Sequence, residues 1–576
     1  MRFTRLAIAM LALLALVRSA AAEWPPGGTR VTLAFDSFNH TRMVRVLDLP
    51  SGDIAVMSVG VGGNAFGYSL QRVTPFGDLA AGWPADGLNL AQVGKSFSPS
   101  QNGFVVDDSG CAWHAAYGMI SNRPSAQLAR PDGGVLPSTY GSWSATTTYQ
   151  AAGPMDVCDA QGGAYVVWGG RIQRLLRSGA TAPGWPSNGL SLGGSWWETA
   201  VRPDGEGGAV GFGIAPGTSP VVQRVDANAV RHAGWPATGL TLSSDPNAAD
   251  ADFDPSWIDP LLPSGPDHFI AAWTTPYNST VKSVHLQRFS IEGTLDPDWP
   301  TEGLLAVAPD TISGVTLLAD GGGGVHVLWY AHGRAWGIHV LADGGVPDGM
   351  TGDPVELSGA SAFFSLPMTF TGSGLVPLPY VVAAPASGGR LLFAFDDTHS
   401  APARGYRVRW LLPDYTPDPS EPSEGRLVAP TAPLARWVRA VHADPVGGAY
   451  LAWEADDPDP GPYLSDIGEI WMTRLLPSAL VGVTPPVAHS ATLALSAPRP
   501  NPARGSVALD VTLPDDSPAR VELLDVAGRV VRNQTVQGAG PHAVAFSDFA
   551  SLAPGLYFAR VSGRAGAAST RLVVSR

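Results

Sequence analysis

The chain has 576 residues, of which 45% are hydrophobic and only 15% are charged, and its formal net charge is −14. This apolar content is sufficient for folded cores and excludes a chain that is disordered throughout. The negative charge, with no run rich in Lys or Arg, excludes nucleic acid as an expected partner.

The N-terminus has the three parts of a secretory signal peptide. Met1 to Arg5 carries positive charge, Leu6 to Val17 is an apolar run, and Ala20 to Ala22 supplies small residues before a cleavage site. The apolar run is too short for a membrane-spanning helix, which needs about 20 apolar residues. We therefore expect residues 1–22 to be removed on export. No later segment of the sequence has the length and apolar character of a membrane span.

A unit that starts with a glycine turn and continues into an apolar strand recurs along residues 23–485. The 68 Gly and 52 Pro of the chain are typical of short strands joined by tight turns. The clearest copies start at Gly162-Gly163, Gly207-Gly208, Gly323-Gly324, Gly388-Gly389 and Gly447-Gly448. With weaker copies at Ser51-Gly52, Ser109-Gly110 and Ser264-Gly265, about eight copies lie roughly 45 to 65 residues apart.

Two further features recur within the unit. A second strand carries a Gln-Arg pair, as in Gln71-Arg72, Gln173-Arg174, Gln223-Arg224 and Gln287-Arg288. A Trp-Pro turn follows, and its tryptophans are Trp83, Trp185, Trp235 and Trp299. Since Pro fixes φ and an indole ring fills a large space, we interpret these tryptophans as wedges between neighbouring sheets rather than as an exposed platform for a ligand. The Gln-Arg pairs are interpreted as recurring hydrogen bonds of each sheet.

This period predicts an all-β fold, a seven- or eight-bladed β-propeller over residues 23–485. One small sheet cannot bury both of its faces alone, so each unit has to pack against its neighbours, and a closed ring protects the end units. Strands expected at 31–35 and 43–49 precede the first glycine turn and are candidates to complete the last blade. An open β-solenoid is the alternative architecture.

Cys111 and Cys158 are the only cysteines of the chain. They flank two successive glycine turns, so they are expected on neighbouring inner strands. An exported protein meets an oxidising environment, in which the two form a disulfide candidate. Two buried thiols are the alternative, and neither cysteine has a partner at the spacing of a zinc site.

No constellation of catalytic residues stands out in the sequence. Walker loops, His-Glu-x-x-His, nucleophile elbows and paired zinc ligands are absent from it. Asp250, Asp252 and Asp254 place carboxylates at alternate positions and form a weak calcium candidate, but the loop lacks the Gly and distal Glu of an EF-hand. A solvated acidic loop is the favoured interpretation, and calcium is the one cofactor that the sequence suggests.

After a linker predicted at 486–495, residues 496–576 show a different pattern. Apolar and polar residues alternate from Val507 to Leu513, and further short strands follow, which predicts a small immunoglobulin-like β-sandwich. The region resembles the type A C-terminal sorting domain of the bacterial type IX secretion system, and more loosely the immunoglobulin-like module of the flagellar hook-assembly protein. The resemblance rests on a Pro-Asn-Pro start, a Gly-Arg hairpin and a Pro-Gly-Leu-Tyr-Phe turn, with the residues Pro500, Asn501, Pro502, Gly528, Arg529, Gly555 and Tyr557.

If the resemblance holds, it implies passage across an outer membrane and contact with the secretion machinery. The expected location is then outside the cell or on the outer surface of a bacterium. For the repeat region we favour a non-enzymatic binding or structural protein with a glycan or protein ligand. The alternative is a polysaccharide hydrolase or lyase whose carboxylates converge at the propeller channel from separate blades. Acidic residues at the channel would favour the enzyme, and an apolar, structural lining would favour binding.

Overall fold

The computed structural model divides into two compact parts, residues 1–481 and residues 482–576. The structure describes residues 24, 28–32, 40–62, 65–80, 83–84, 87–94, 104–106, 110–118, 123–130, 139–140, 155–158, 163–194, 196, 198–215, 217–251, 260–276, 279, 281–357, 362–363, 368–371, 374–377, 381–397, 405–428, 435–445, 447–456, 468–477, 494–495, 498, 501, 503–513, 517–526, 529–538, 540–547, 549, 552–564 and 566–575. The predicted signal peptide lies outside these residues.

Antiparallel pairing groups the first part into four-stranded sheets, numbered here along the chain. Sheet 1 consists of β2 (His40–Asp48), β3 (Ile54–Gly62), β4 (Ala65–Val73) and β5 (Leu88–Gly94). Sheet 2 consists of β6 (Phe104–Val106), β7 (Ala112–Gly118), β8 (Arg123–Ala129) and β9 (Thr139–Tyr140). Sheet 3 consists of β10 (Met155–Cys158), β11 (Ala164–Trp168), β12 (Arg171–Leu175) and β13 (Leu190–Ser191). Sheet 4 consists of β14 (Glu198–Pro203), β15 (Ala209–Ile214), β16 (Val221–Val225) and β17 (Leu240–Thr241).

Sheets 5 and 6 share one long strand, β21 (Leu304–Ala319). Its first half pairs with β20 and its second half with β22, so that seven strands form one continuous sheet. Sheet 5 starts with β18 (Leu261–Pro263), β19 (His268–Thr275) and β20 (Val281–Ser290). Sheet 6 continues with β22 (Val325–Ala331), β23 (Arg334–Val340) and β24 (Val355–Glu356). The short 3-10 segment η1 (Pro246–Asp250) precedes sheet 5 and is the one helix among the described residues.

The last two sheets are less regular. Sheet 7 consists of β28 (Val382–Ala386), β29 (Arg390–Asp397), β30 (Gly405–Leu411) and β31 (Arg426–Val428), with β25 (Ala362–Phe363) beside the end of β29. The hairpin of β26 (Met368–Thr371) and β27 (Gly374–Pro377) stands apart from it. Sheet 8 consists of β32 (Ala435–Ala443), β33 (Ala449–Asp456), β34 (Gly468–Leu475) and the N-terminal strand β1 (Thr29–Thr32).

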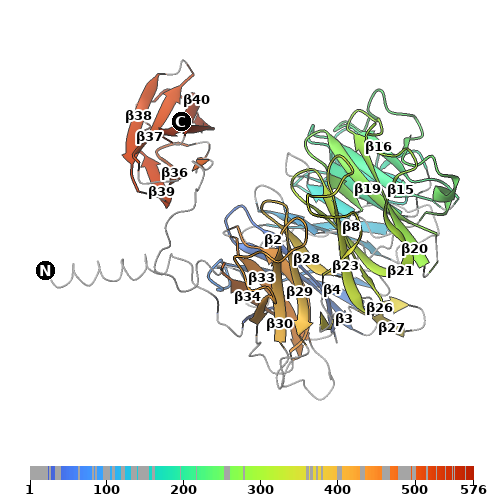
Figure 1. Cartoon of the computed structure of the whole chain (residues 1–576). Coiled ribbons are helices and arrows are strands. Elements are labelled where there is room, and N and C mark those ends of the chain that lie inside the picture. The colour runs from blue at the N-terminus through green and yellow to red at the C-terminus, as the bar shows by residue number, and fades with distance from the viewer. Residues whose placement is uncertain are drawn as a thin grey trace. The chain divides into compact units, whose positions relative to one another are not determined.

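The sheets form a closed, propeller-like ring. The first strand of each sheet contacts the first strand of the next, and β32 of sheet 8 contacts β2 of sheet 1 (Figure 1). The described residues thus give eight sheets, which favours the higher of the two predicted blade numbers. Aromatic and branched side chains fill the layers between sheets, and one buried cluster runs from Tyr165 of sheet 3 to Val340 of sheet 6.

Each glycine pair marks the start of a second strand, and in sheets 4, 6 and 8 its second glycine has a steric reason. In sheet 4 the Gly208 N–H donates to the Asp204 carboxylate at 2.7 Å. A Cβ on Gly208 would lie 2.2 Å from the carbonyl oxygen of Val225, on the third strand. Gly324 and Gly448 are equally close to the third strands of sheets 6 and 8. A side chain at this position would separate the strands, so the turn requires glycine.

The N-terminal segment closes the ring. β1 pairs antiparallel with β34, so a strand from the start of the chain completes the last sheet, which confirms that part of the prediction. The segment expected at 43–49 instead belongs to β2, the first strand of sheet 1. Two hydrogen bonds to one carbonyl strengthen the closure. The Trp24 indole N–H and the Arg474 Nη1 both donate to the Pro75 carbonyl, at 2.9 and 3.1 Å.

The same double contact joins sheets in the interior of the ring. Trp185 Nε1 and Arg174 Nη1 of sheet 3 both donate to the Ala227 carbonyl of sheet 4, at 2.9 and 3.1 Å. Trp235 and Arg224 of sheet 4 likewise donate to one carbonyl of sheet 5, that of Ile291. Each pair of donors therefore connects two neighbouring sheets. In sheet 8 the arginine is Arg474, and the tryptophan is Trp24 from the N-terminal segment, because no tryptophan follows β34 in the sequence.

Residues 482–576 form a separate β-sandwich. One sheet has the order β35 (Ala494–Leu495), β36 (Val507–Leu513) and β39 (Gly540–Phe546). The other has the order β38 (Val530–Val536), β37 (Ala519–Asp525), β40 (Gly555–Gly563) and β41 (Gly566–Val574). Alternate residues of the facing strands, such as Val521, Leu523, Ala559 and Val561, are fully buried between the sheets. The strand β35 shows that the end of the predicted linker already belongs to the sandwich.

Candidate functional site

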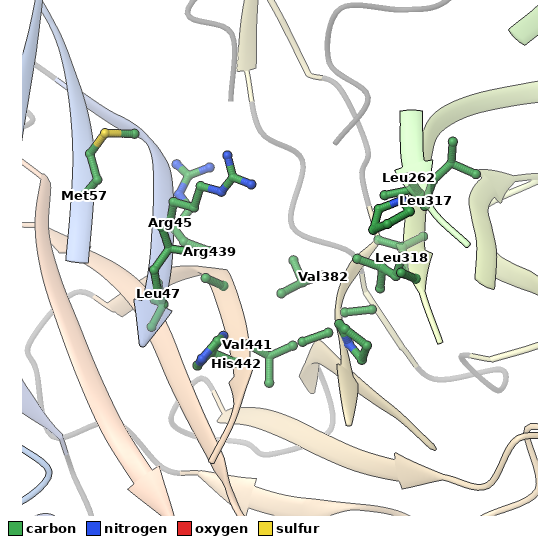
Figure 2. Close-up of a pocket in the computed structure, with 18 of the residues that line it drawn as sticks. Arg45, Leu47, Met57, Leu262, Leu317, Leu318, Val382, Arg439, Val441 and His442 are labelled. Atoms are coloured by element: carbon green, nitrogen blue, oxygen red, sulfur yellow. The ribbon is translucent and has the colours of Figure 1, made fainter. Parts of the chain in front are cut away.

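The ring channel contains a cavity of about 390 Å³, which is lined by first strands of several sheets. The described lining includes residues of β2, β14, β18, β21, β28 and β32, which come from sheets 1, 4, 5, 6, 7 and 8. Leu47, Leu318, Val382 and Val441 are among the apolar side chains that face it (Figure 2). Cavities of about 300 to 1,000 Å³ are typical of sites for small molecules.

Three arginines line the same cavity. Figure 2 shows Arg45 of β2 and Arg439 of β32 among the residues that line it. Arg439 is almost fully buried and donates through Nε to the Glu454 carboxylate at 2.8 Å. Arg202 of β14 also lines the cavity, and its Nε donates to the Leu261 carbonyl at 3.0 Å. None of the lining residues that the structure describes is Asp or Glu.

A second hollow of about 930 Å³ lies where the first strands reach the glycine turns. Ala319 and Pro385 line both cavities, so the two are adjacent along the channel. Three aspartates stand at this mouth, and each has a basic partner. Asp48 lies 3.2 Å from His442, Asp320 lies 3.0 Å from His339, and Asp444 accepts from Arg474 at 2.6 Å.

Sheet 6 carries a buried polar network beside the mouth. The rings of His326 and His339 are 4.1 Å apart. His339 Nε2 lies 3.0 Å from an Asp320 oxygen and Nδ1 lies 2.9 Å from the Pro413 carbonyl, an arrangement that needs a proton on each nitrogen. His326 Nδ1 lies 3.1 Å from the hydroxyl of Tyr415, which sheet 7 supplies.

The pKa values of this network follow from burial and neighbouring charge. Burial, helped by the nearby His339, lowers the pKa of His326 from 6.5 to about 3. Burial would raise the pKa of Asp320, but hydrogen bonds from His339 and from the Gly322 and Gly324 amides outweigh it and hold that pKa at about 2. Burial also raises the pKa of Tyr415 well above its usual value. Near neutral pH the network thus contains an ionised Asp320, bonded to His339, beside a neutral His326 and a neutral Tyr415.

The structure places the tryptophans of the Trp-Pro turns between sheets. Trp185, Trp235 and Trp299 are buried, and each indole donates to a carbonyl of the next sheet; the acceptor of Trp299 is Ala342, at 3.0 Å. Trp83 is half-buried. Three glutamines of the Gln-Arg pairs, Gln71, Gln173 and Gln223, donate to the proline carbonyl of their own Trp-Pro turn, as Gln173 Nε2 does to the Pro186 carbonyl at 2.7 Å. The buried side-chain amide of Gln287 makes no such bond. These repeated residues hold the ring and do not form the channel site.

The cysteine and calcium predictions remain predictions. Cys111 is buried in a cluster that includes Ala164, and Ala164 is the register partner of Cys158. The side chain of Cys158 lies outside the described part of the structure, as do Asp252, Asp254 and the side chain of Asp250. Within the described residues, no group of three or more His, Cys, Asp or Glu is arranged to hold a metal ion.

Several of the sorting-motif residues tie the sandwich together. Asn501 accepts from the Val573 amide at 2.8 Å and donates to the Arg571 carbonyl at 3.3 Å, so the start of the module is bonded to its last strand. Tyr557 donates to the Ala553 carbonyl at 2.8 Å, and Arg529 pairs with Asp525. Gly555 opens β40. Pro500, Pro502 and Gly528 lie outside the described residues.

Residues 499–575 match the family described as the secretion system C-terminal sorting domain. The C-terminal module is a type IX sorting domain. The protein is therefore secreted or displayed at the cell surface, and the sorting domain interacts with the secretion machinery. Among the helical segments that the structure describes, none has the length and apolar character needed to span a bilayer.

Comparison with known proteins adds no assignment for the ring. No curated protein matches the chain. Among solved structures, BBS1N in complex with ARL6DN is 10% identical, with a TM-score of 0.31 and coverage of 80% of this chain and 96% of that chain. A polysaccharide lyase of family PL25, an ulvan lyase, is 11% identical, with a TM-score of 0.34 and coverage of 66% and 92%. A quinonprotein alcohol dehydrogenase-like protein from Bacteroides thetaiotaomicron is 9% identical, with a TM-score of 0.28 and coverage of 85% and 87%. These TM-scores are too low to support an argument about function.

The sequence did not point to the channel arginines. Arg45, Arg202 and Arg439 lie on first strands, which share no recurring motif, and nearly 400 residues separate the first from the last. His326 is packed in the core of sheet 6. The only available signal was the position of each arginine a few residues before a glycine turn, which places it near the channel once the ring is known.

Proposed function

We propose that this protein is a non-enzymatic binding protein, exported through its sorting domain, that holds its ligand in the ring channel. The observation that carries the proposal is the described channel lining, which combines apolar side chains with Arg45, Arg202 and Arg439. Glycoside hydrolysis ordinarily requires a pair of carboxyl groups on either side of the scissile bond. The described lining offers recognition groups, Glu454 is bonded to Arg439 of the lining, and the three aspartates at the mouth are each engaged by a basic side chain.

The test uses the mature full-length protein and a panel of glycans, polysaccharides and extracellular proteins. Binding is measured by calorimetry, and turnover is measured as released reducing ends or unsaturated sugar ends. We expect binding without product. The variant Leu318→Trp places a large ring at the cavity and should abolish binding. Its control, Leu427→Trp, changes an exposed leucine on β31 and should bind normally.

Two outcomes would overturn the proposal. Release of product by the wild-type protein, but not by Leu318→Trp, would establish the alternative, a polysaccharide hydrolase or lyase acting at the channel. Binding that both tryptophan variants retain would move the ligand site away from the channel.

A further inference from the structure

The outer face of one sheet of the sorting domain carries exposed apolar side chains. This sheet has the order β38-β37-β40-β41, and its inner face supplies much of the sandwich core (Figure 1). Four of the ten large hydrophobic residues that are exposed in the described part of the chain lie here, namely Val526, Val530, Leu556 and Val573. Single exposed residues of this kind are ordinary on soluble proteins, whereas a group of them marks a contact surface.

The strand register places these side chains on one face and at one end of the sheet. Leu556 of β40 is the register partner of Val573 of β41, and Leu524 of β37 is the partner of Val530 of β38. Leu524 is also the partner of Phe558 of β40, so an apolar row crosses all four strands. The residues next to the row in sequence pack in the core on the other face: Leu523, Val531, Tyr557 and Leu572.

Exposed arginines accompany the apolar row, while the acids beside them are largely covered. The exposed fractions of three arginine side chains are 63% for Arg520, 81% for Arg529 and 44% for Arg560. Their ion-pair partners Glu522 and Asp525 are only 6% and 16% exposed. Arg571, the register partner of Phe558, is exposed as well. The charge that a partner would meet on this face is therefore positive.

The rest of the described surface of the sandwich offers no comparable apolar group. The outer face of the other sheet presents Ala508 and Ala545, which are exposed register partners. The start of the module covers the edge of β41, where Ala503 pairs in parallel with Val574 and Asn501 accepts from the next strand amide. The apolar row is thus the large apolar surface that this fold leaves available for contact.

We propose that the apolar row and its arginines are the surface by which the sorting domain docks on a protein component of the secretion machinery. The module is a sorting domain, so that machinery has to recognise some surface of it. Large apolar side chains with arginine beside them are typical of the residues that dominate protein–protein contacts. The positive charge of the face indicates that the component presents apolar side chains flanked by carboxylates. This inference concerns export and is independent of the ligand in the channel.

The experiment expresses the full-length chain in its source bacterium and measures the exported fraction against the fraction retained inside the cell envelope. The test variants are Leu556→Glu, Val573→Glu and Arg571→Glu. Ala508→Glu makes the same change on the outer face of the other sheet. Arg564→Glu changes an exposed arginine in the turn between β40 and β41, at the opposite end of the sheet. Thermal unfolding of each purified variant shows whether it is folded.

We expect Leu556→Glu and Val573→Glu to lower the exported fraction about tenfold, because each would bury a carboxylate without a partner in an apolar contact. Arg571→Glu should lower it about threefold, since it sets like charge against an acidic partner. This variant leaves the apolar row in place, so it decides the matter if either of the other two melts early. The two control variants should be exported like the wild type. Export of every folded variant at the wild-type level would overturn the proposal.

A photoreactive benzophenone side chain identifies what occupies the face in the cell. In place of Val573 it should crosslink to an outer-membrane protein whose loss stops export, and in place of Ala508 it should not. A crosslink from position 573 only to a second copy of this chain would make the face a self-association surface and overturn the proposal. A crosslink only to lipid would assign the face to the membrane, with the same consequence.

Discussion

Sheet 6 shows how single residues substitute for one another within the repeat. His339 occupies the position in sheet 6 that Arg224 occupies in sheet 4. Each of the two residues pairs with the second residue of the second strand in its sheet, and each is bonded to the aspartate of the glycine turn. The backbone N–H of Met350 donates to the carbonyl three residues before it, and the backbone N–H of Trp235 makes the same bond in sheet 4. Met350 therefore occupies the position of the repeat's tryptophan. Tyr415 from sheet 7 packs on the histidines instead. Hydrogen bonding to the turn is preserved with different side chains.

We predict that His326 makes the ring sensitive to acid. The unfolded chain binds a proton at this histidine near pH 6.5, whereas the folded chain does so only near its pKa of about 3. Stability is therefore fully present above pH 6.5 and is lost as the pH falls toward 3, by up to about 1.4 kcal/mol per pH unit. Below about pH 3.8, protonation of Asp320 in the unfolded chain adds to the loss.

The measurement is urea unfolding of wild type and His326→Asn between pH 7 and pH 4. Asparagine keeps a hydrogen-bond acceptor for Tyr415 and cannot titrate, so its slope with pH should be shallower. His332→Asn is the control, since His332 is exposed, is bonded to Asp310, and has a positive φ that asparagine tolerates. Equal slopes for wild type and His326→Asn would disprove the role of His326.

The residue pattern of the sequence predicted only the regular part of the repeat. Gln173 and Trp185, or Gln223 and Trp235, are separated by a constant twelve residues, so the recurrence is visible without a structure. His339, Met350 and Tyr415 perform equivalent tasks with different chemistry, and one of them comes from the following sheet. Recurrence cannot reveal such a replacement, because it depends on which side chains share a space.

At the scale of elements, ring closure depends on a short N-terminal segment. Gly28 has a φ of +86°, and a Cβ there would lie 2.2 Å from the Trp453 ring, which is fully buried. Gly52 has nearly the same φ, +84°, but no atom within 4 Å of its Cβ position. A substitution would therefore cause the same backbone strain at both glycines, but only at Gly28 would the added Cβ collide with a neighbouring side chain.

We predict that Gly28→Ala destabilises the ring much more than Gly52→Ala. The second change should cost about 1 to 2 kcal/mol from the left-handed backbone alone. The first adds a clash with an indole that cannot move, so it should also weaken the pairing of β1 with β34. Thermal unfolding and protease digestion of the N-terminal segment measure both effects. Similar melting temperatures for the two variants would contradict the closure described here.

The sequence predicted that two N-terminal strands complete the last sheet; the pairing of β1 confirms this for the first of them, and the second belongs to sheet 1. The part played by Trp24 was not foreseen. It stands in a Trp-Pro step like those of the repeat, but its partner Arg474 lies 450 residues away, and no Gln-Arg pair precedes it. A motif divided between the two ends of a chain becomes recognisable only when the ring brings its halves together.

At the scale of the whole molecule, the ring and the sorting domain are separate folded parts with opposite charge balance. Residues 496–576 carry an excess of arginine over acid, whereas the chain as a whole has a net charge of −14. Each part has its own buried core. Export and ligand binding should therefore be separable by mutation.

We predict that removal of residues 496–576 leaves the ring folded but retains the protein inside the cell envelope. Cell fractionation measures location, and circular dichroism with thermal unfolding measures the fold. The full-length Leu318→Trp variant is the control, because it changes the channel and should be exported normally. Surface display or release of the truncated protein at the wild-type level would show that another signal directs export.

The shared strand β21 gives the ring a mechanical asymmetry. Sheets 5 and 6 are joined by sixteen residues of continuous strand with hydrogen-bonded partners along both halves, whereas β13 of sheet 3 and β14 of sheet 4, for example, are separate strands. A protease finds no exposed loop at this seam, and a force that opens the ring must act elsewhere. Sheets 5 and 6 therefore form a rigid double blade. The ring is expected to open first at the junction that the short strand β1 closes by pairing with β34.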